Sequence, residues 1–233
     1  MTVLNLKKVW KKNLPNKLTD MKRNYKLLQD AQLKEVEQKK QEGNLPKLLL
    51  HACCAPCSSA VLEKLSQFFD ITIFYYNPNI YPDAEYQRRL NELKQFLTKF
   101  KPSQNRINLV EAEYNPEDFY TAVNTEKEPE LAKEAERGER CRRCYLFRMQ
   151  KAYEFAVTNN FDYFTTTLSI SPYKDAEKIN VIGEMLQQPE GPSYLYADFK
   201  KGNGFLRSLQ LSEEYGLYRQ DYCGCVFSRE NKL

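Results

Sequence analysis

Seven cysteines are the residues of this chain whose type and spacing point most directly to chemistry. They form three groups, and the first group lies in the stretch LLLHACCAPC. Free cysteines rarely cluster in this way when they only fill a core, so thiol redox chemistry or metal binding is expected. The groups are Cys53, Cys54 and Cys57, then Cys141 and Cys144, and finally Cys223 and Cys225.

The first group by itself is typical of a dithiol enzyme. Cys54-Ala-Pro-Cys57 is a CxxC motif between a predicted strand and a predicted helix, which is the thioredoxin-like redox context. However, Cys53 directly precedes the pair, and four more cysteines follow downstream. A simple dithiol oxidoreductase needs none of these additional thiols, which argues against this interpretation. We keep it as an alternative.

The second group favours a metal site built from four thiolates. Cys141 and Cys144 form another CxxC at the expected start of a helix, and Cys53 and Cys54 supply two further thiolates. Zinc and an iron–sulfur cluster both accept such a set. Two adjacent cysteines rarely aim both sulfurs at one ion, which favours the larger cluster. The only histidine, His51, is a possible ligand, but on a strand it is expected to be a hydrogen-bonding core residue.

Four arginines flank the second group. We expect their charge, together with the amides of the helix terminus, to lower the thiol pKa values and to offset the charge of bound thiolates. In the third group, Gly224 permits the dihedral angles that a strained pairing of Cys223 with Cys225 needs. Strained, accessible disulfides are redox-active, and two further metal ligands are the alternative. The four arginines are Arg137, Arg140, Arg142 and Arg143.

Five motifs, in order and well spread along the chain, make it similar to a known family. They are HACCAPC, FYYNPNIYPDAEYQRR, CRRCYLFRM, FTTTLSISPYKD and GLYRQDYCGCVFS. From about Lys47 to Ser228 the sequence resembles the cobalamin-independent epoxyqueuosine reductase family, QueH. The resemblance implies reduction of epoxyqueuosine to queuosine at the tRNA wobble position, the last step of this modification. That reaction consumes two electrons and two protons and releases water.

The resemblance also implies the cofactors, which are a [4Fe-4S] cluster and one neighbouring iron. Some members carry an aspartate that looks like an iron ligand where this chain has Cys57, so a thiolate is expected to replace it here. The cluster ligands look like Cys53, Cys54, Cys141 and Cys144, and the redox-active pair looks like Cys223 with Cys225, unless these two are additional metal ligands.

The expected partners are a tRNA that contains epoxyqueuosine and an unidentified electron donor. The target base lies in a single-stranded loop, where bases stack on aromatic side chains. The leaving oxygen needs a proton, which tyrosine or lysine can deliver. The candidate proton donors are Tyr75, Tyr76, Tyr173, Lys174 and Tyr222. The expected substrate contacts are Tyr75, Tyr76, Asn77, Asn79, Arg88 and Ser171, with Arg89 as a further one unless both arginines lie on a solvated helix face.

Apolar segments alternate with amphipathic ones from Pro46 onward, which predicts an α/β fold, Rossmann-like, with three layers and a mostly parallel sheet. Ligands of such sheets bind at the carboxyl ends of the strands, where the first cysteines and the loops YYNPNIYP and SISPYK fall. The expected strands are KLLLHA, DITIFYYN, RINLVEAEY, YFTTTLSI and SYLYADF. The expected helices are SSAVLEKLSQFF, DAEYQRRLNELKQFLTKF, PEDFYTAV, RCRRCYLFRMQKAYEFAVTNN, DAEKINVIGEMLQQ and FLRSLQLSEEYG.

Residues 1–45 are predicted to be a basic helical N-terminal extension, and residues 46–233 an α/β catalytic domain. The extension contains 11 Lys/Arg and 5 Asp/Glu. Apolar residues at spacings of three and four predict a helix from about Lys17 to Gln41, which Gly43 and Pro46 end. The extension is either a basic arm for RNA or a helix that packs on the domain by one face.

Composition narrows the classes of protein. Of 233 residues, 42% are hydrophobic and 28% charged, which is neither disordered nor membrane-like. No apolar run approaches the ~18 residues of a membrane helix, and the absence of a signal-peptide pattern predicts a cytoplasmic protein with reduced thiols. The net charge of +4 and 16 tyrosines are compatible with nucleic acid. A zinc-stabilised RNA-binding module without catalysis is therefore the second alternative.

Overall fold

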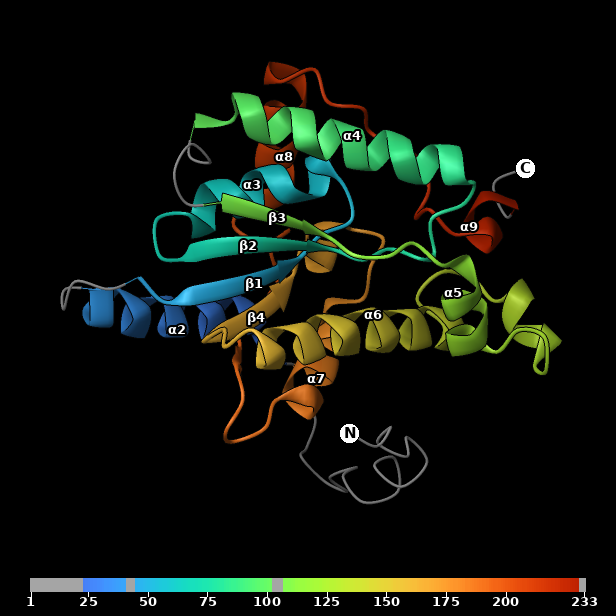
Figure 1. Ribbon diagram of the computed structural model, residues 1–233, viewed down its shortest axis with the longest axis horizontal. Coiled ribbons are helices and arrows are strands. Elements are labelled where there is room, and N and C mark those ends of the chain that lie inside the picture. Colours follow the sequence, from blue (N-terminus) through green and yellow to red (C-terminus); the bar gives the residue numbers. More distant parts are fainter. Residues whose placement is uncertain (1–22, 41–44, 102–106, 231–233) are drawn as a thin grey trace.

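Short apolar and β-branched segments form one sheet of five parallel strands in the order β3-β2-β1-β4-β5. The computed structural model describes residues 23–40, 45–101 and 107–230 (Figure 1). The chain first runs outward from β1 to β3 and then returns to place β4 on the other side of β1. The strands are β1 (Lys47–His51), β2 (Asp70–Tyr75), β3 (Ile107–Glu111), β4 (Tyr163–Thr166) and β5 (Ser193–Tyr194).

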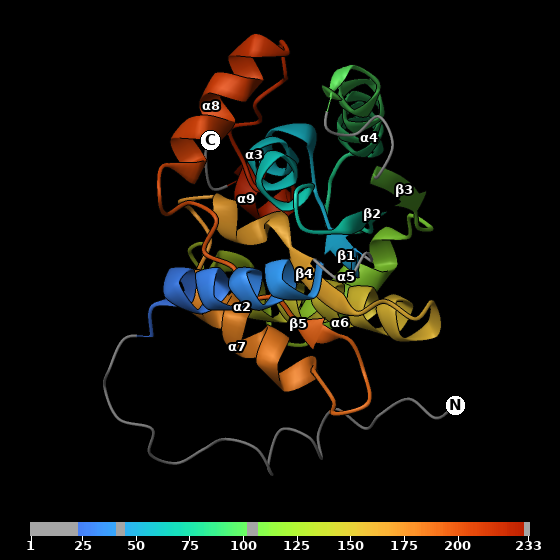
Figure 2. The ribbon, with the colours of Figure 1, turned by 90° about the vertical axis from the view of Figure 1, so that its left-hand side faces the viewer.

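Helices cover both faces of the sheet, as Figure 2 shows, so the predicted α/β three-layer fold is confirmed. The first face carries α3 (Ala55–Leu65), α4 (Asp83–Lys99) and α8 (Gly204–Glu214). The second carries α6 (Glu139–Thr158) and α7 (Ala176–Leu186), with α5 (Pro116–Val123) packed on α6. Three short helical segments were not predicted: η2 (Pro129–Lys133), η3 (Thr167–Ile170) and α9 (Val226–Glu230).

The surroundings of strand β1 explain why its sequence is apolar without alternation. Leu48 and Leu50 belong to the core beneath α3 and α4, whereas Leu49 belongs to the core beneath α6. Successive side chains of a strand point to opposite faces, and here both faces are covered. Each buried leucine contributes roughly 1.5–3 kcal/mol, so this strand fixes the centre of the sheet and the position of the residues that follow it.

The strand predicted for YFTTTLSI is too long. Strand β4 ends at Thr166, and the remaining residues form η3. The Thr166 hydroxyl accepts a hydrogen bond from the Leu168 N–H at 3.2 Å, which turns the chain out of the sheet. The strand predicted for SYLYADF shortens to the two residues of β5, although Leu195 still donates to the Phe164 carbonyl at 3.0 Å.

Helix α2 (Tyr25–Lys40) is the described part of the N-terminal extension, and it begins later than predicted. The Asn24 side chain accepts from the Leu27 N–H at 3.4 Å, as an N-cap does. Residues 17–22, Gln41 and Gly43 lie outside the described ranges. The helix docks on the β5 edge, where Gln32 donates to the Tyr194 carbonyl and accepts from the Tyr196 N–H, both at 2.9 Å. The division at residues 45 and 46 stays a prediction.

Gln32 therefore satisfies backbone groups that an open sheet edge would leave unpaired. We expect Gln32→Leu to lower the free energy of unfolding by about 1–3 kcal/mol, measured by urea denaturation. Gln38→Leu, on an exposed position of the same helix, is the matched control and should change little. Equal values for both variants would show that the edge contacts contribute nothing measurable.

Candidate metal centre at the carboxyl edge of the sheet

The turn between β1 and α3 gathers the first three cysteines. Cys54 is the N-cap of α3, and its Sγ accepts a hydrogen bond from the Cys57 N–H at 3.3 Å. Pro56 in the first turn suits a helix start because its missing N–H is not needed there. The Cys53 and Cys54 sulfurs lie 3.8 Å apart, and all three Sγ atoms lie within 4.8 Å of one another. These three thiols could hold a metal ion.

The first turns of α6 bring the second group to the same edge. Cys141 and Cys144 are both buried. Cys141 belongs to the same apolar cluster as Cys53 and Cys54, whereas Cys144 packs with Cys225 in a smaller cluster. The helix therefore connects the first group of cysteines with the third.

The third group lies on the C-terminal strap, which we define as residues 218–225. The strap is tied to the loop after β2, because the Tyr81 N–H donates to the Gly224 carbonyl at 2.8 Å. It is also tied to α4, because Arg89 donates to the Cys223 carbonyl at 3.2 Å. Gly224 has a φ of 120°, which only glycine adopts without strain. The expectation of unusual dihedrals at this glycine is confirmed, and both strap cysteines are free thiols.

Two thiols of the site favour the thiolate. A hydrogen bond from Cys225 lowers the pKa of Cys223 to about 5, with further help from the charges of Lys174 and Arg148. Hydrogen bonds from Cys54 and Cys57 lower the pKa of Cys53 well below its usual value. Burial instead raises the pKa of Cys54 to about 12. The strap thiolate also raises the pKa values of Cys141 and Cys144, so the three groups share one electrostatic environment.

Burial outweighs the flanking arginines, although the charge of Arg140 does act on Cys141 in the predicted direction. Burial raises the pKa of Cys141 to about 11, and the pKa of Cys144 is raised too, so the predicted lowering is wrong. The arginine side chains are committed elsewhere. Arg140 donates to the carbonyls of η2 and of the residue that follows it. Arg142 and Arg143 both pair with Glu139. Arg137 donates to the carbonyls of Pro172 and Tyr173.

Arg148 supplies positive charge that the sequence analysis did not identify. It is 1% exposed, and its Nη1 lies 3.9 Å from the Cys144 Sγ. Its Nη2 donates to the Asn77 side chain, which in turn donates to the Ala52 carbonyl at 2.9 Å. The charges of Cys53 and Cys223 also raise the pKa of Arg148, which favours its charged form. Arg148 follows Cys144 by four residues, so helical spacing alone could have placed the two on one face.

Lys174 is the second cation of the site. Burial opposes its charge, but the sulfurs of Cys223, Cys53 and Cys57 raise its pKa above the usual value. It belongs to the loop after η3, so a different strand end delivers it. Arg148 and Lys174 thus approach the thiols from two elements.

Sequence comparison identifies the family. Residues 48–231 match the family described as Epoxyqueuosine reductase QueH. This chain belongs to the QueH family. It is 40% identical over 213 residues to Epoxyqueuosine reductase QueH of Streptococcus pyogenes, which covers 91% of this chain and 82% of that protein. The protein of the same name in Staphylococcus epidermidis is 38% identical, covering 91% and 89%, and that in Thermotoga maritima 34%, covering 78% and 89%.

The donor set of this QueH-family protein fits an anionic metal group held by thiolates. Within the described ranges, the polar partners of the Arg148 guanidinium are the Cys144 Sγ and the Asn77 amide oxygen, and its Nε is unpartnered. A buried cation without a counter-ion is costly. Metal-bound thiolates carry negative charge, which the two cations Arg148 and Lys174 would balance.

The structure places the predicted substrate contacts in different surroundings. Tyr75 is fully buried in the core, and its O–H donates to the Tyr86 carbonyl at 3.4 Å. The Tyr76 O–H donates to Asp118 at 2.9 Å. Asn79 is buried, and its Oδ1 has no hydrogen-bond partner within the described part of the chain. Asn77, as described, holds Arg148 beside the thiols.

The remaining contacts lie on α4 and after η3. Arg88 is exposed on α4, with its guanidinium carbon 3.3 Å from the Tyr218 ring centroid. Arg89 is fully buried and pairs with Glu85, so neither RNA contact nor a solvated face describes it. The Ser171 hydroxyl accepts from the Tyr173 N–H at 3.2 Å, so it shapes its own loop.

Two of the candidate proton donors remain to be placed. The Tyr222 O–H donates to the Tyr81 carbonyl at 2.9 Å. Tyr173 is 69% exposed, although Arg137 donates a hydrogen bond to its backbone carbonyl at 3.2 Å. Of the five candidates, Lys174 combines partial exposure with interaction with the thiols.

His51 is a core residue, as predicted. Its Nε2 donates to the Tyr76 carbonyl at 3.1 Å, because a carbonyl can only accept. Its Nδ1 then accepts from the Thr166 hydroxyl at 2.8 Å. Burial lowers the pKa of His51 to about 3, so the ring is neutral. Both nitrogens are used, and His51 instead joins β1 to β4 below the thiols.

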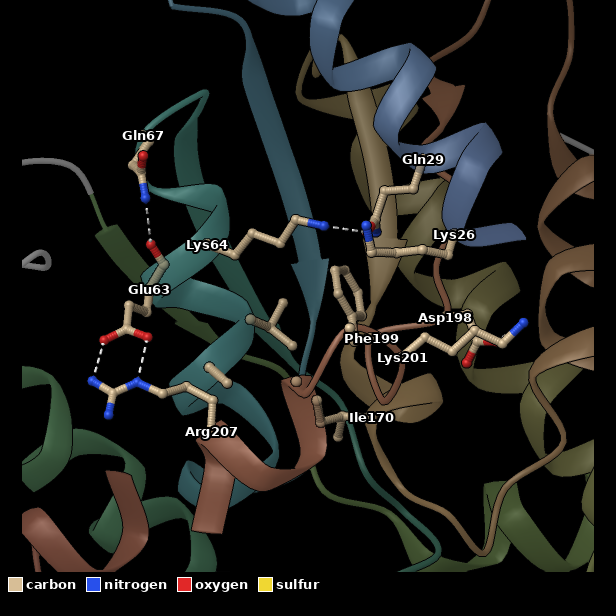
Figure 3. Close-up of a pocket in the computed structure, with 14 residues that line it drawn as sticks. Lys26, Gln29, Glu63, Lys64, Gln67, Ile170, Asp198, Phe199, Lys201 and Arg207 are labelled. Carbon is tan, nitrogen blue, oxygen red and sulfur yellow. Dashed lines mark hydrogen bonds and ion pairs between the residues drawn. The ribbon is translucent and has the colours of Figure 1, made fainter. Parts of the chain in front are cut away.

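A cavity of about 460 Å³ lies away from these residues, between α2, α3 and α8 (Figure 3). Neither the cysteines nor any other predicted site residue lines it. Its charged side chains pair with one another or with neighbours, for example Arg207 with Glu63 at 2.6 Å.

The helices of the described residues were also compared with what a membrane span requires. None of them combines the length and the apolar character that crossing a bilayer needs.

Proposed function

We propose that this protein reduces epoxyqueuosine to queuosine in tRNA by means of a metal centre at the carboxyl edge of the sheet. The observation that carries the proposal is that free thiols from all three groups interact with two cations, Arg148 and Lys174, beside the close trio Cys53, Cys54 and Cys57. The name of the relatives supplies the substrate, epoxyqueuosine. The reaction takes up two electrons and two protons and releases water, so an external electron donor is required.

We assign the cofactors as follows. Cys53, Cys54, Cys141 and Cys144 would hold a [4Fe-4S] cluster, and Cys57 would be a ligand of one additional iron. When bound, these groups would supply low-potential electrons and a Lewis acid for an oxygen atom. Cys223 and Cys225 are the redox-active pair or additional ligands, and the thiolate of Cys223 suits either role.

The chain's own residues would bind and orient the substrate. Lys174 places an ammonium group beside the thiols, where the epoxide oxygen would gain negative charge as its bonds to carbon break. Such preorganised charge stabilises the transition state more than the ground state. The neighbouring Tyr173 has an exposed ring on a braced backbone, which is the arrangement expected of a stacking surface for a base of a single-stranded loop.

Tyr173→Ala is expected to raise the KM for tRNA by roughly 10–100-fold, because one stacked base contributes about 1–3 kcal/mol. The kcat should change little. Tyr173→Phe is the matched control, since it keeps the ring and removes only the hydroxyl, and its kinetics should match the wild type. A loss of kcat in the Phe variant would instead make the hydroxyl a proton donor.

The function itself is tested by anaerobic reconstitution of the protein with iron and sulfide, followed by incubation with epoxyqueuosine-containing tRNA and a chemical reductant. Mass analysis of the released nucleosides should show the loss of one oxygen atom. Full activity in colourless, zinc-loaded protein would overturn the iron–sulfur assignment. Tight tRNA binding without any turnover would favour a zinc-stabilised RNA-binding module, and disulfide reduction that survives loss of Cys141 would favour a dithiol oxidoreductase.

A further inference from the structure

Gln220 contacts the thiols directly, although in the motif GLYRQDYCGCVFS only the two cysteines and Tyr222 were predicted to be site residues. Its Nε2–H donates to the Cys54 Sγ at 3.0 Å and lies 4.0 Å from the Cys57 Sγ. Its Oε1 is buried and has no hydrogen-bond partner in the part of the chain that the structure describes. The amide thus directs its donor to the sulfurs and leaves its acceptor unpaired.

The direction of this hydrogen bond suits a metal-bound sulfur. An amide N–H can only donate, and sulfur accepts better as a thiolate than as a thiol. A ligand sulfur has lost its proton and keeps lone pairs for such a bond. An unpaired buried acceptor costs about 1–3 kcal/mol. The side chain therefore keeps its contact with the sulfurs although its own acceptor lacks a partner.

Other residues hold the strap around Gln220. The Tyr218 N–H donates to the Glu92 carboxylate. Arg219 donates to the Ser212 hydroxyl at 3.0 Å. Tyr222 is tied to the loop after β2, and Cys223 to α4. The strap is therefore anchored on both sides of Gln220, and a substitution of this side chain should leave its path unchanged.

We propose that Gln220 is a positioning residue for the metal centre, which orients the Cys54 and Cys57 sulfurs and stabilises negative charge on Cys54. This inference deepens the proposed function and rests on it. Residues that hydrogen-bond to ligands orient them and tune the metal, and hydrogen bonds to sulfur help to set the potential of a cluster. A donor stabilises the more negative, reduced state, so its removal lowers the reduction potential.

The test uses Gln220→Met, which removes the donor at similar length, and Gln220→Glu, which replaces it with a negative charge. Gln87→Glu, at an exposed position of α4, is the control for added charge. Iron per chain and the midpoint potential are measured anaerobically without tRNA. We expect iron affinity to fall by roughly 10–100-fold in the Gln220 variants. The potential should fall in the order wild type, Gln220→Met, Gln220→Glu, and Gln87→Glu should match the wild type.

Wild-type iron content and potential in both Gln220 variants would overturn the proposal, even if tRNA reduction were lost, since Gln220 would then contact only substrate. Loss of iron from both variants, with circular dichroism unchanged, would support it. If the wild type itself retains only zinc, the proposed function fails. The positioning role is then decided by the zinc affinity of the same variants: a fall of roughly 10–100-fold supports it, and no change overturns it.

Discussion

Replacing Cys141 with serine is expected to remove about four iron atoms per chain, those of the cluster, and epoxyqueuosine reduction with them. Serine is nearly isosteric with cysteine, but its hydroxyl does not ionise near neutral pH and is a poor ligand for the iron of a cluster. Cys141 is buried in one cluster with Cys53 and Cys54, so no water can take its place without reorganisation. Iron analysis and visible absorption of the anaerobic variant measure the effect.

Cys57→Asp is the matched control for this experiment. It removes a thiol from the same site but introduces the carboxylate that some members of the family carry there. We expect this variant to keep its four cluster irons and part of its activity, because Cys57 is assigned to the additional iron. A cluster that survives in Cys141→Ser but not in Cys57→Asp would show that the assigned ligand set is wrong.

The sheet and the place of the site were predictable because both follow from periodicity. An apolar run such as LLLH, without alternation, indicates a strand covered on both faces, and alternation of strands with helices indicates parallel pairing. Parallel strands bring their carboxyl ends to one edge, which places Cys53 beside the loops after β2 and η3. The same argument could not find the end of β4, because a single hydrogen bond from the Leu168 N–H to the Thr166 hydroxyl decides it.

The electrostatics of the site were not predictable from neighbours in sequence. Arg142 and Arg143 directly precede Cys144, yet they pair with Glu139 of the same helix. Adjacent helical residues point in different directions, whereas residues four apart share a face, which is why Arg148 is the cation that reaches the thiols. Gln220 lies within the stretch GLYRQDYCGCVFS, but the path of its loop depends on many tertiary contacts, so the stretch alone does not show that its amide reaches the thiols.

Arg148→Met is expected to destabilise the metal-loaded protein more than the metal-free protein. In the loaded state the variant leaves buried negative charge without its cation, which costs about 3–5 kcal/mol. That cost corresponds to a fall of roughly 6–20 °C in the melting temperature. In the metal-free state only Cys53 and Cys223 favour the thiolate, so less charge is left uncompensated. Parallel thermal melts of both forms measure the difference.

The difference between the two forms separates charge from packing. The methionine variant leaves the Asn77 side chain without its donor in both forms, so that loss cancels in the comparison. Arg142→Met is the control on the same helix, where a partly exposed ion pair contributes at most about 1 kcal/mol in either form. Equal destabilisation of the loaded and metal-free Arg148→Met protein would mean that Arg148 acts through Asn77 alone. A larger loss in the loaded form would show that the guanidinium is the counter-charge of an anionic metal centre.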